Sequence, residues 1–127
     1  ELTWDSVRDP VGRARLELNR RVAAPGGPGS LTLDPALAVP RNVSGIDVHL
    51  MPGNYDREAG ADDATQGAFF DHGATVFYMG LMGADQGDIG RTLARFLRGK
   101  HPDLEVRRIL DLGCTVGHNT LPWAEAY

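Results

Sequence analysis

Apolar residues recur every three or four positions in several parts of this 127-residue chain, which is the spacing of amphipathic helices. The first such pattern follows Asp9 and Pro10, which suit the N-cap and the first position of a helix, and it continues to about Ala23. The sequence APGGPGS at 24–30 then breaks the pattern. We therefore expect residues 1–30 to form an N-terminal helix followed by a flexible connector.

The pattern predicts a mostly helical region over residues 31–105. Three prolines in its first part prevent a long regular element, and the alternation in GIDVHLM at 45–51 predicts a short strand or an extended arm. Helical spacing returns over 62–83, where the glycines at 67, 73 and 80 each weaken the helix by about 1 kcal/mol relative to alanine. Such glycines make sense if a backbone or a ligand passes closely along that face.

A cleaner helix is predicted next. Asp85 or Asp88 can cap its N-terminus, and GKHP at 99–102 ends it with glycine and then proline. One apolar stripe runs along it, formed by Ile89, Leu93, Phe96 and Leu97.

The pattern changes again at the end of the chain. Residues 106–112 read as a short buried strand, 113–117 as a turn, and a helix is expected from His118 onward. The switch from helical spacing to a short apolar run marks the start of an α/β unit.

Composition and charge narrow the class of protein. The chain is 42% apolar and 24% charged, as globular proteins are, and its net charge of −4 argues against a nucleic-acid partner. Its apolar stretches are too short for a membrane span. The single cysteine excludes an internal disulfide framework and fits a reducing, cytoplasmic setting. His49, Asp71 and His72 match no ligand spacing of a metal site, so we expect none.

The segment that suggests chemistry is ILDLGCTVGHNT at 109–120. A phosphate loop would need glycine and lysine at 118 and 119, where the chain has His118 and Asn119. The dinucleotide fingerprint lacks two of its three glycines, since 115 is threonine and 118 histidine. A carboxylate beside the turn instead suits a cofactor that carries positive charge and no phosphate, either by charge attraction or by ordering the loop.

This segment resembles motif I of the class I S-adenosylmethionine-dependent methyltransferases, whose pattern is apolar–apolar–Asp/Glu–x–Gly–x–Gly–x–Gly. The matching residues are Ile109, Leu110, Asp111, Leu112, Gly113, Cys114 and Gly117, and Thr120 stands where many members have threonine. Thr115 and Val116 depart from the usual Gly-Thr, and threonine at 115 brings a β-branched side chain to a position with positive φ in the family.

The resemblance implies a fold, a cofactor and a set of residues. The fold would be α/β, with an N-terminal helical lid over residues 31–105 and the first strand–loop–helix of a Rossmann-like methyltransferase domain over 106–127, its sheet incomplete in this chain. S-adenosylmethionine would lie against Asp111, Gly113, Cys114, Thr115 and Gly117. Cys114 is expected to be a small packing residue rather than a nucleophile.

The region before the motif would shape a substrate pocket, with Tyr55, His72 and Tyr78 as candidates, while the neighbouring phenylalanines 69, 70 and 77 are expected in the core. The sequence thus predicts the N-terminal portion of a longer methyltransferase, inactive by itself, whose acceptor is a small molecule and whose oligomeric state is open. The alternative is a non-enzymatic helical interaction or regulatory domain in which the glycine turn is incidental.

Overall fold

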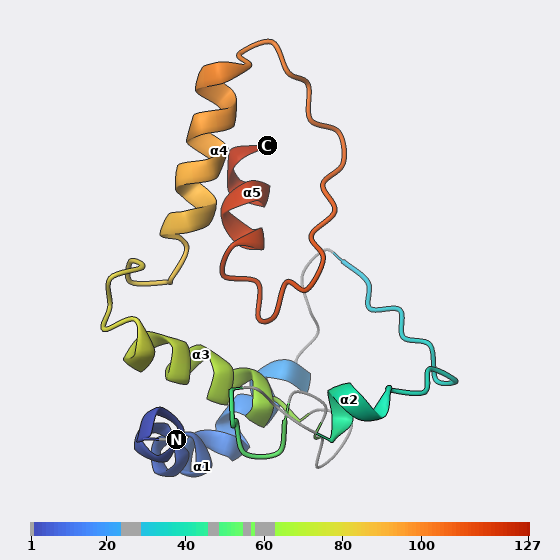
Figure 1. Cartoon of the computed structure of the whole chain (residues 1–127), viewed down its shortest axis with the longest axis vertical. Helices are drawn as coiled ribbons and strands as arrows, with labels where there is room; N and C mark the ends of the chain where they lie inside the picture. Colours follow the sequence, from blue (N-terminus) through green and yellow to red (C-terminus); the bar gives the residue numbers. More distant parts are fainter. Residues whose placement is uncertain (1, 24–28, 46–48, 55–56, 58–62) are drawn as a thin grey trace. The chain divides into compact units, whose positions relative to one another are not determined.

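The computed structural model describes residues 2–23, 29–45, 49–54, 57 and 63–127 of the chain, and within them every regular element is a helix (Figure 1). The helices are α1 (Leu2–Ala23), α2 (Arg41–Ser44), α3 (Thr65–Phe77), α4 (Asp88–Lys100) and α5 (Thr120–Ala126). The chain divides into two compact units, 1–73 and 74–127, so that α3 begins in the first and ends in the second. Each unit has its own set of contacts.

The core of the first unit lies along one side of α1. Trp4, Val7 and Val11 follow helical spacing and are buried, and they form one cluster with Met51 and Phe69. Because these side chains come from α1, from the loop after α2 and from α3, the cluster joins these three segments. Burial of such apolar side chains is the main stabilising contribution to a unit of this size.

Polar side chains fix the chain around this core. The indole N–H of Trp4 donates a hydrogen bond to the carbonyl oxygen of His49. Asn19 of α1 accepts a hydrogen bond from the N–H of Ala64 at 3.0 Å, just before α3 begins. Gln66 of α3 donates to the carbonyl oxygen of Pro52 at 3.0 Å. These bonds hold irregular backbone where apolar burial alone would not specify it.

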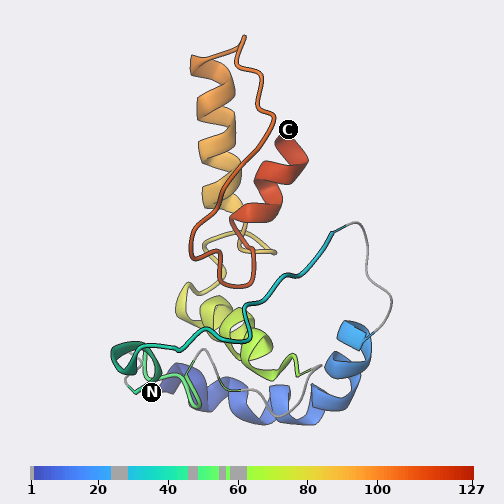
Figure 2. The ribbon, with the colours of Figure 1, turned by 90° about the vertical axis from the view of Figure 1, so that its right-hand side faces the viewer.

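In the second unit α5 packs beside α4, as Figures 1 and 2 both show. The contact uses small residues: Gly90 and Ala94 of α4 are buried, and Pro122 of α5 lies against Gly90. A Cβ at position 90 would lie 2.7 Å from the carbonyl oxygen of Asn119. Glycine at 90 therefore permits the close approach of the two helices.

The predicted α/β fold is wrong for the described residues. Residues 106–112 form neither a helix nor a ladder with any described segment, and Leu112 lies in a bend. Leu110 and Leu112 are 81% and 82% exposed where the prediction has a buried strand. The physical reason is that a strand is defined by hydrogen bonds to neighbouring strands, and no described residue forms such a ladder with this segment.

Several helix boundaries also differ from the prediction. α1 begins at Leu2, so Pro10 lies inside the helix rather than at its first turn, where the buried residues on either side of it hold the helix together. α3 ends at Phe77, before a turn in which Met79 and Gly80 both have positive φ. Three residues of the predicted arm at 45–51 lie outside the described residues. The predicted end of α4 is confirmed, since the helix stops at Lys100.

Burial differs from the prediction at two places. The stripe expected along α4 is spaced as predicted, but Ile89, Leu93 and Phe96 are 44%, 51% and 63% exposed within the described structure. Of the three phenylalanines expected in the core, Phe69 is buried but Phe77 is 68% exposed. In both places the helical spacing is as predicted, but no described residue buries these apolar side chains.

Candidate functional site

The residues that the sequence predicts to bind the cofactor lie in one turn, which we call the glycine loop (residues 111–120). Three of its residues have left-handed backbone conformations: Gly113 has φ 74°, Thr115 has φ 52° and Gly117 has φ 88°. Left-handed φ is unfavourable for a β-branched residue, so Thr115 is strained. Every second residue from 113 to 117 therefore has a left-handed backbone conformation.

Short-range hydrogen bonds maintain this conformation. The N–H of Gly117 donates to the carbonyl oxygen of Cys114 at 2.9 Å, and the hydroxyl of Thr115 donates to the same oxygen at 2.7 Å. The N–H groups of Thr120 and Leu121 both donate to the carbonyl oxygen of Gly117 at 3.0 Å. Since every partner lies within a few residues, the shape of the turn depends on local sequence.

Asp111 closes the loop from its other end. Its Oδ2 accepts a hydrogen bond of 2.5 Å from the hydroxyl of Thr120, the first residue of α5. The carboxylate is exposed, and a Cβ placed on Gly113 would meet no atom within 4 Å. Cys114 is exposed as well, so it is not the packing residue that the sequence predicted. The backbone at Gly113 is therefore open to a molecule approaching from solvent.

Two side chains at the end of the loop connect it to the rest of the second unit. Asn119 accepts a hydrogen bond from the N–H of Gly90 at 3.1 Å. His118 lies with its Nε2 3.4 Å from the Nε2 of Gln86, and Gln86 in turn donates to the hydroxyl of Thr75 at 2.9 Å. These contacts anchor the loop to α4 and to the turn before it.

Sequence reasoning missed Gln86, which is 7% exposed and has φ 59°. It stands in the polar run ADQGD, where nothing distinguishes a buried glutamine from a solvated one. Asn119 precedes a helix, which suggests an N-cap, but its side chain bonds α4 instead of its own helix. Only the tertiary structure identifies these two anchors.

Of the three residues predicted to shape a substrate pocket, the structure describes His72 and Tyr78. Tyr55 lies outside the described residues. His72 lies on α3 in the first unit, half exposed, with its Nδ1 3.3 Å from Asp71 Oδ2. Tyr78 belongs to the second unit and makes an edge-to-face contact with Phe77, their ring centroids 5.2 Å apart. A role for them in substrate binding stays a prediction.

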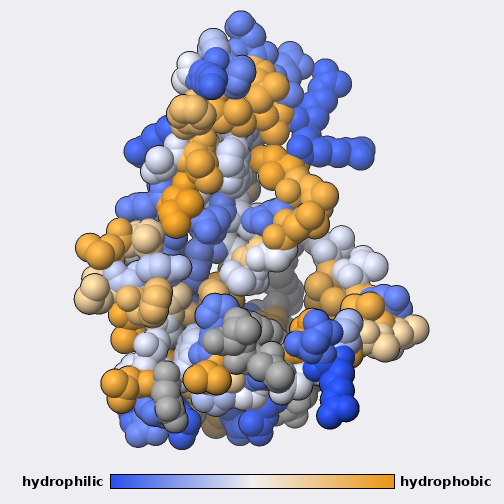
Figure 3. Space-filling model, viewed as in Figure 1, coloured by the Kyte–Doolittle hydropathy of each residue, from blue (hydrophilic) through white to orange (hydrophobic). Residues whose placement is uncertain are grey.

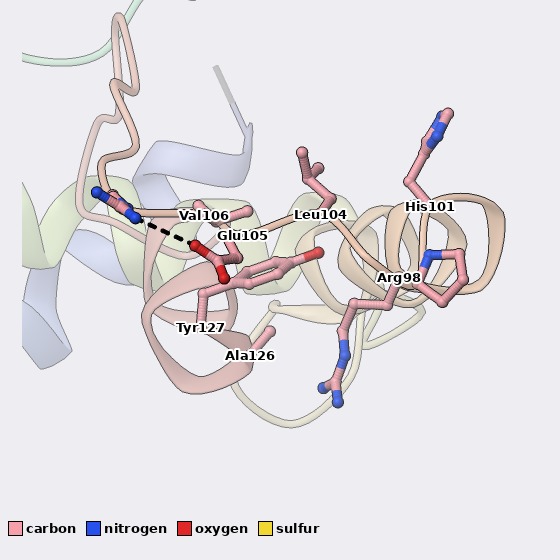
Figure 4. A pocket seen from close by; sticks show the side chains of 9 residues that line it. Arg98, His101, Leu104, Glu105, Val106, Ala126 and Tyr127 are labelled. Atoms are coloured by element: carbon pink, nitrogen blue, oxygen red, sulfur yellow. Dashed lines mark hydrogen bonds and ion pairs between the residues drawn. The ribbon is translucent and has the colours of Figure 1, made fainter.

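A cavity of about 610 Å³ lies in the second unit, between the end of α4, the extended segment and the end of α5 (Figure 4). Its lining includes Arg98, His101 and Tyr127, together with the ion pair between Arg107 and Glu105 at 3.2 Å. No residue of the glycine loop contributes to it. It holds basic groups but no nucleophile beside a base, so it offers no evident catalytic arrangement.

The strongest electrostatic feature stands at the start of α4. The guanidinium of Arg91 donates hydrogen bonds to both carboxylate oxygens of Asp85 and lies 3.4 Å from Asp88. The hydrogen bond from Arg91, with a further one from the N–H of Gly87, holds the pKa of Asp85 well below its ordinary range. Both acidic groups are exposed, so this arrangement orders the turn and is not a catalytic centre.

Within the part of the chain that the structure describes, no three His, Cys, Asp or Glu side chains are grouped so as to hold a metal ion. None of the described helices is both long enough and apolar enough to cross a membrane. Comparisons with protein-family models, with curated proteins and with solved structures find no match to this chain.

Proposed function

We propose that this chain binds S-adenosylmethionine through the glycine loop and serves methyl transfer to a small-molecule acceptor. The observation that carries the proposal is the left-handed backbone at Gly113, Thr115 and Gly117. These are the three positions at which the methyltransferase motif has glycine. A left-handed threonine costs roughly 1–2 kcal/mol, so the turn keeps its form even where the side chain opposes it.

The loop suits the methionine and ribose part of this cofactor. The open face at Gly113 admits close approach to the backbone, which any larger residue would obstruct. The exposed carboxylate of Asp111 can accept hydrogen bonds from an ammonium or a ribose hydroxyl. S-adenosylmethionine carries a sulfonium and an ammonium against one carboxylate and has no phosphate, so its net charge is positive and favours a carboxylate beside it.

S-adenosylmethionine would supply the methyl group of its sulfonium. An electron-rich atom of the acceptor bonds to this methyl carbon as the C–S bond breaks and S-adenosylhomocysteine leaves, so no protein nucleophile is needed. The contribution of the loop is therefore positional. Holding the two reactants in line removes much of the entropic barrier to their reaction. The exposed thiol of Cys114 has no part in this scheme.

Calorimetric titration of the full chain with S-adenosylhomocysteine tests the proposal. We expect binding that Asp111→Ala weakens at least tenfold. Asp103→Ala is the matched control, since Asp103 is also an exposed carboxylate of the second unit but lies outside the loop. A wild-type chain that gives no heat, or equal affinities for the two variants, would contradict the proposal.

A third variant separates the two roles that Asp111 can have. Asp111→Asn retains an oxygen that can accept the hydrogen bond from Thr120, but it removes the charge. If Asp111 acts by ordering the loop, the asparagine variant should bind within a few fold of wild type. If it acts by charge attraction, the asparagine and alanine variants should lose affinity equally.

A second function is favoured by a different observation. The described residues are all helical in their regular elements, and α4 leaves Ile89, Leu93 and Phe96 partly exposed on one side; apolar surface is visible on the second unit in Figure 3. Such a surface is typical of helical interaction domains. That function needs no cofactor, so a chain that is folded but indifferent to S-adenosylhomocysteine would favour it.

A further inference from the structure

The extended segment of the second unit (residues 105–112) runs between α4 and α5 without forming a helix or a strand, and its backbone leaves an unpaired edge. Within the described part of the chain, none of its backbone N–H or C=O groups forms a hydrogen bond with another backbone group. Its apolar side chains are open to solvent: Ile109 is 45% exposed, Leu110 81% and Leu112 82%. Such an edge is a template for pairing with another extended chain.

We propose that residues 106–112 of two copies of this chain pair as antiparallel strands about a two-fold axis at Ile109. The partner is thus a second copy of the same segment. The inference does not require methyl transfer, although Asp111 belongs both to this segment and to the glycine loop.

Symmetry limits the possible registers. Side chains directly opposite each other in an antiparallel pair lie on the same face of the sheet, whereas neighbours along one strand lie on opposite faces. A register that set Ile109 against Leu110 of the other copy would therefore place the two copies of Ile109 on different faces. No two-fold axis relates such a pair, and two-fold symmetry is the rule for homodimers. One residue must consequently face its own copy.

Charge then selects among the symmetric registers. With Ile109 facing Ile109, Arg107 lies opposite Asp111 and Val106 opposite Leu112, and symmetry repeats each pair. Opposite charges and apolar pairs across strands both stabilise a ladder. Arg108 faces Leu110, so no like charges meet. This register thus pairs Arg107 with Asp111 and packs Leu112 against Val106 of the other copy.

The other registers are worse. Centring on positions 107, 108 or 111 sets like charges against each other, and centring on 110 or 112 aligns no opposite charges. Centring on Val106 does align Glu105 with Arg107, but the turn between His101 and Leu104 shortens that ladder, and it leaves Leu110 and Leu112 uncovered.

The local structure is compatible with this pairing. The ion pair that Arg107 makes with Glu105 is exposed, with 86% and 81% of the two side chains accessible, so Arg107 can exchange it for Asp111 of the other copy. At the far end, the left-handed backbone of Gly113 ends the ladder. A two-stranded ribbon is only marginally stable, so the association should be weak and depend on protein concentration.

Disulfide trapping tests the register directly. In a Cys114→Ser background, Ile109→Cys places two thiols opposite each other across the axis, where Cβ atoms are roughly 4.5–5.5 Å apart. A disulfide needs Cβ atoms at about 3.5–4.5 Å, which a small adjustment of a ribbon allows. The control is Leu112→Cys, at a position more exposed than Ile109 (82% against 45%), whose two copies would be six positions out of register, about 20 Å apart.

We expect Ile109→Cys to form a disulfide dimer at least tenfold more than Leu112→Cys at equilibrium in the same glutathione buffer. Equal yields from the two variants would overturn the proposal, because exposed thiols that meet by random collision show no preference for the axis. A preference for Leu112→Cys would overturn it as well.

Charge reversal gives a second test, read as the disulfide yield of the Ile109→Cys variant. Adding Arg107→Asp to that variant should reduce the yield to that of the Leu112→Cys control, because it sets two carboxylates against each other. Adding Asp111→Arg as well should restore it, while Asp111→Arg without Arg107→Asp should not. Failure of the double reversal to restore the yield, in a chain whose circular dichroism is unchanged, would overturn the assignment of the ion pairs.

Discussion

The substitution Gly73→Ala should destabilise the first unit, although alanine normally favours a helix. A Cβ at position 73 would lie 2.1 Å from Cζ3 of Trp4 and 2.7 Å from Cε3. Carbon atoms in contact are normally about 3.5–4.0 Å apart, so the indole ring would have to move by more than about 1 Å. The ring has little room, since Trp4 is 8% exposed and its N–H is bonded to His49.

The magnitude follows from three contributions. Overpacking of this kind costs about 1–3 kcal/mol, and loss of the bond between Trp4 and His49 costs about 1 kcal/mol more. Alanine in place of glycine inside a helix returns about 1 kcal/mol. The net loss in the free energy of unfolding should be about 1–3 kcal/mol.

Gly12→Ala is the matched control for Gly73→Ala. Gly12 also lies inside a helix of the first unit, but a Cβ there would meet no atom within 4 Å. It should raise the free energy of unfolding by about 0.5–1 kcal/mol. Urea denaturation read by tryptophan fluorescence measures both, in a Trp123→Phe background that leaves Trp4 as the sole tryptophan. If Gly73→Ala unfolds at the same or a higher urea concentration than Gly12→Ala, the reasoning from the Trp4 contact is refuted.

Three further predictions concern the second unit, read by urea denaturation with the fluorescence of its own tryptophan. Thr115→Gly should stabilise it by up to about 1 kcal/mol, because relief of the left-handed strain outweighs the added freedom of the unfolded chain; an unchanged midpoint would contradict this. Gly90→Ala should cost about 1–3 kcal/mol, because its Cβ would lie 2.7 Å from the carbonyl oxygen before α5, whereas Gly99→Ala, which meets no atom within 4 Å, should be neutral or slightly stabilising. Asp85→Asn should make the stability of the second unit less dependent on pH on the acid side. In the wild type, Arg91 lowers the pKa of Asp85 in the folded state, so the ionised Asp85 stabilises the fold above the pKa of the unfolded chain. This stabilisation is lost as the pH falls through the folded pKa. Parallel curves for wild type and Asp85→Asn below about pH 5 would contradict that assignment.

Helices could be located from the sequence, but the faces they bury could not. Helical spacing found α4 and its end at Lys100 because spacing, capping and a following proline act within the helix itself. Burial is decided by what lies against the helix, and the described structure buries Gly90 and Ala94 while leaving the larger stripe exposed. The start of α1 was misplaced for a related reason. Asp9 and Pro10 favour a helix start locally, yet the apolar residues before them, Trp4 and Val7, extend the helix to Leu2 by packing in the core.

The end of the chain separates local from non-local determinants of structure most clearly. Two adjacent segments were predicted from one motif, a strand over 106–112 and a turn over 113–117. The turn forms, with positive φ at Gly113 and Gly117, because the hydrogen bonds within it join residues at most nine positions apart; the longer-range contacts of His118 and Asn119 hold only its end. The strand does not form within the described residues, because a ladder needs a second extended chain, and apolar residues in the right order supply only one side of it. The binding test on the loop and the pairing test on the extended segment share Asp111 but measure different events. The loop holds its shape with the strand unpaired, so binding can be observed without pairing.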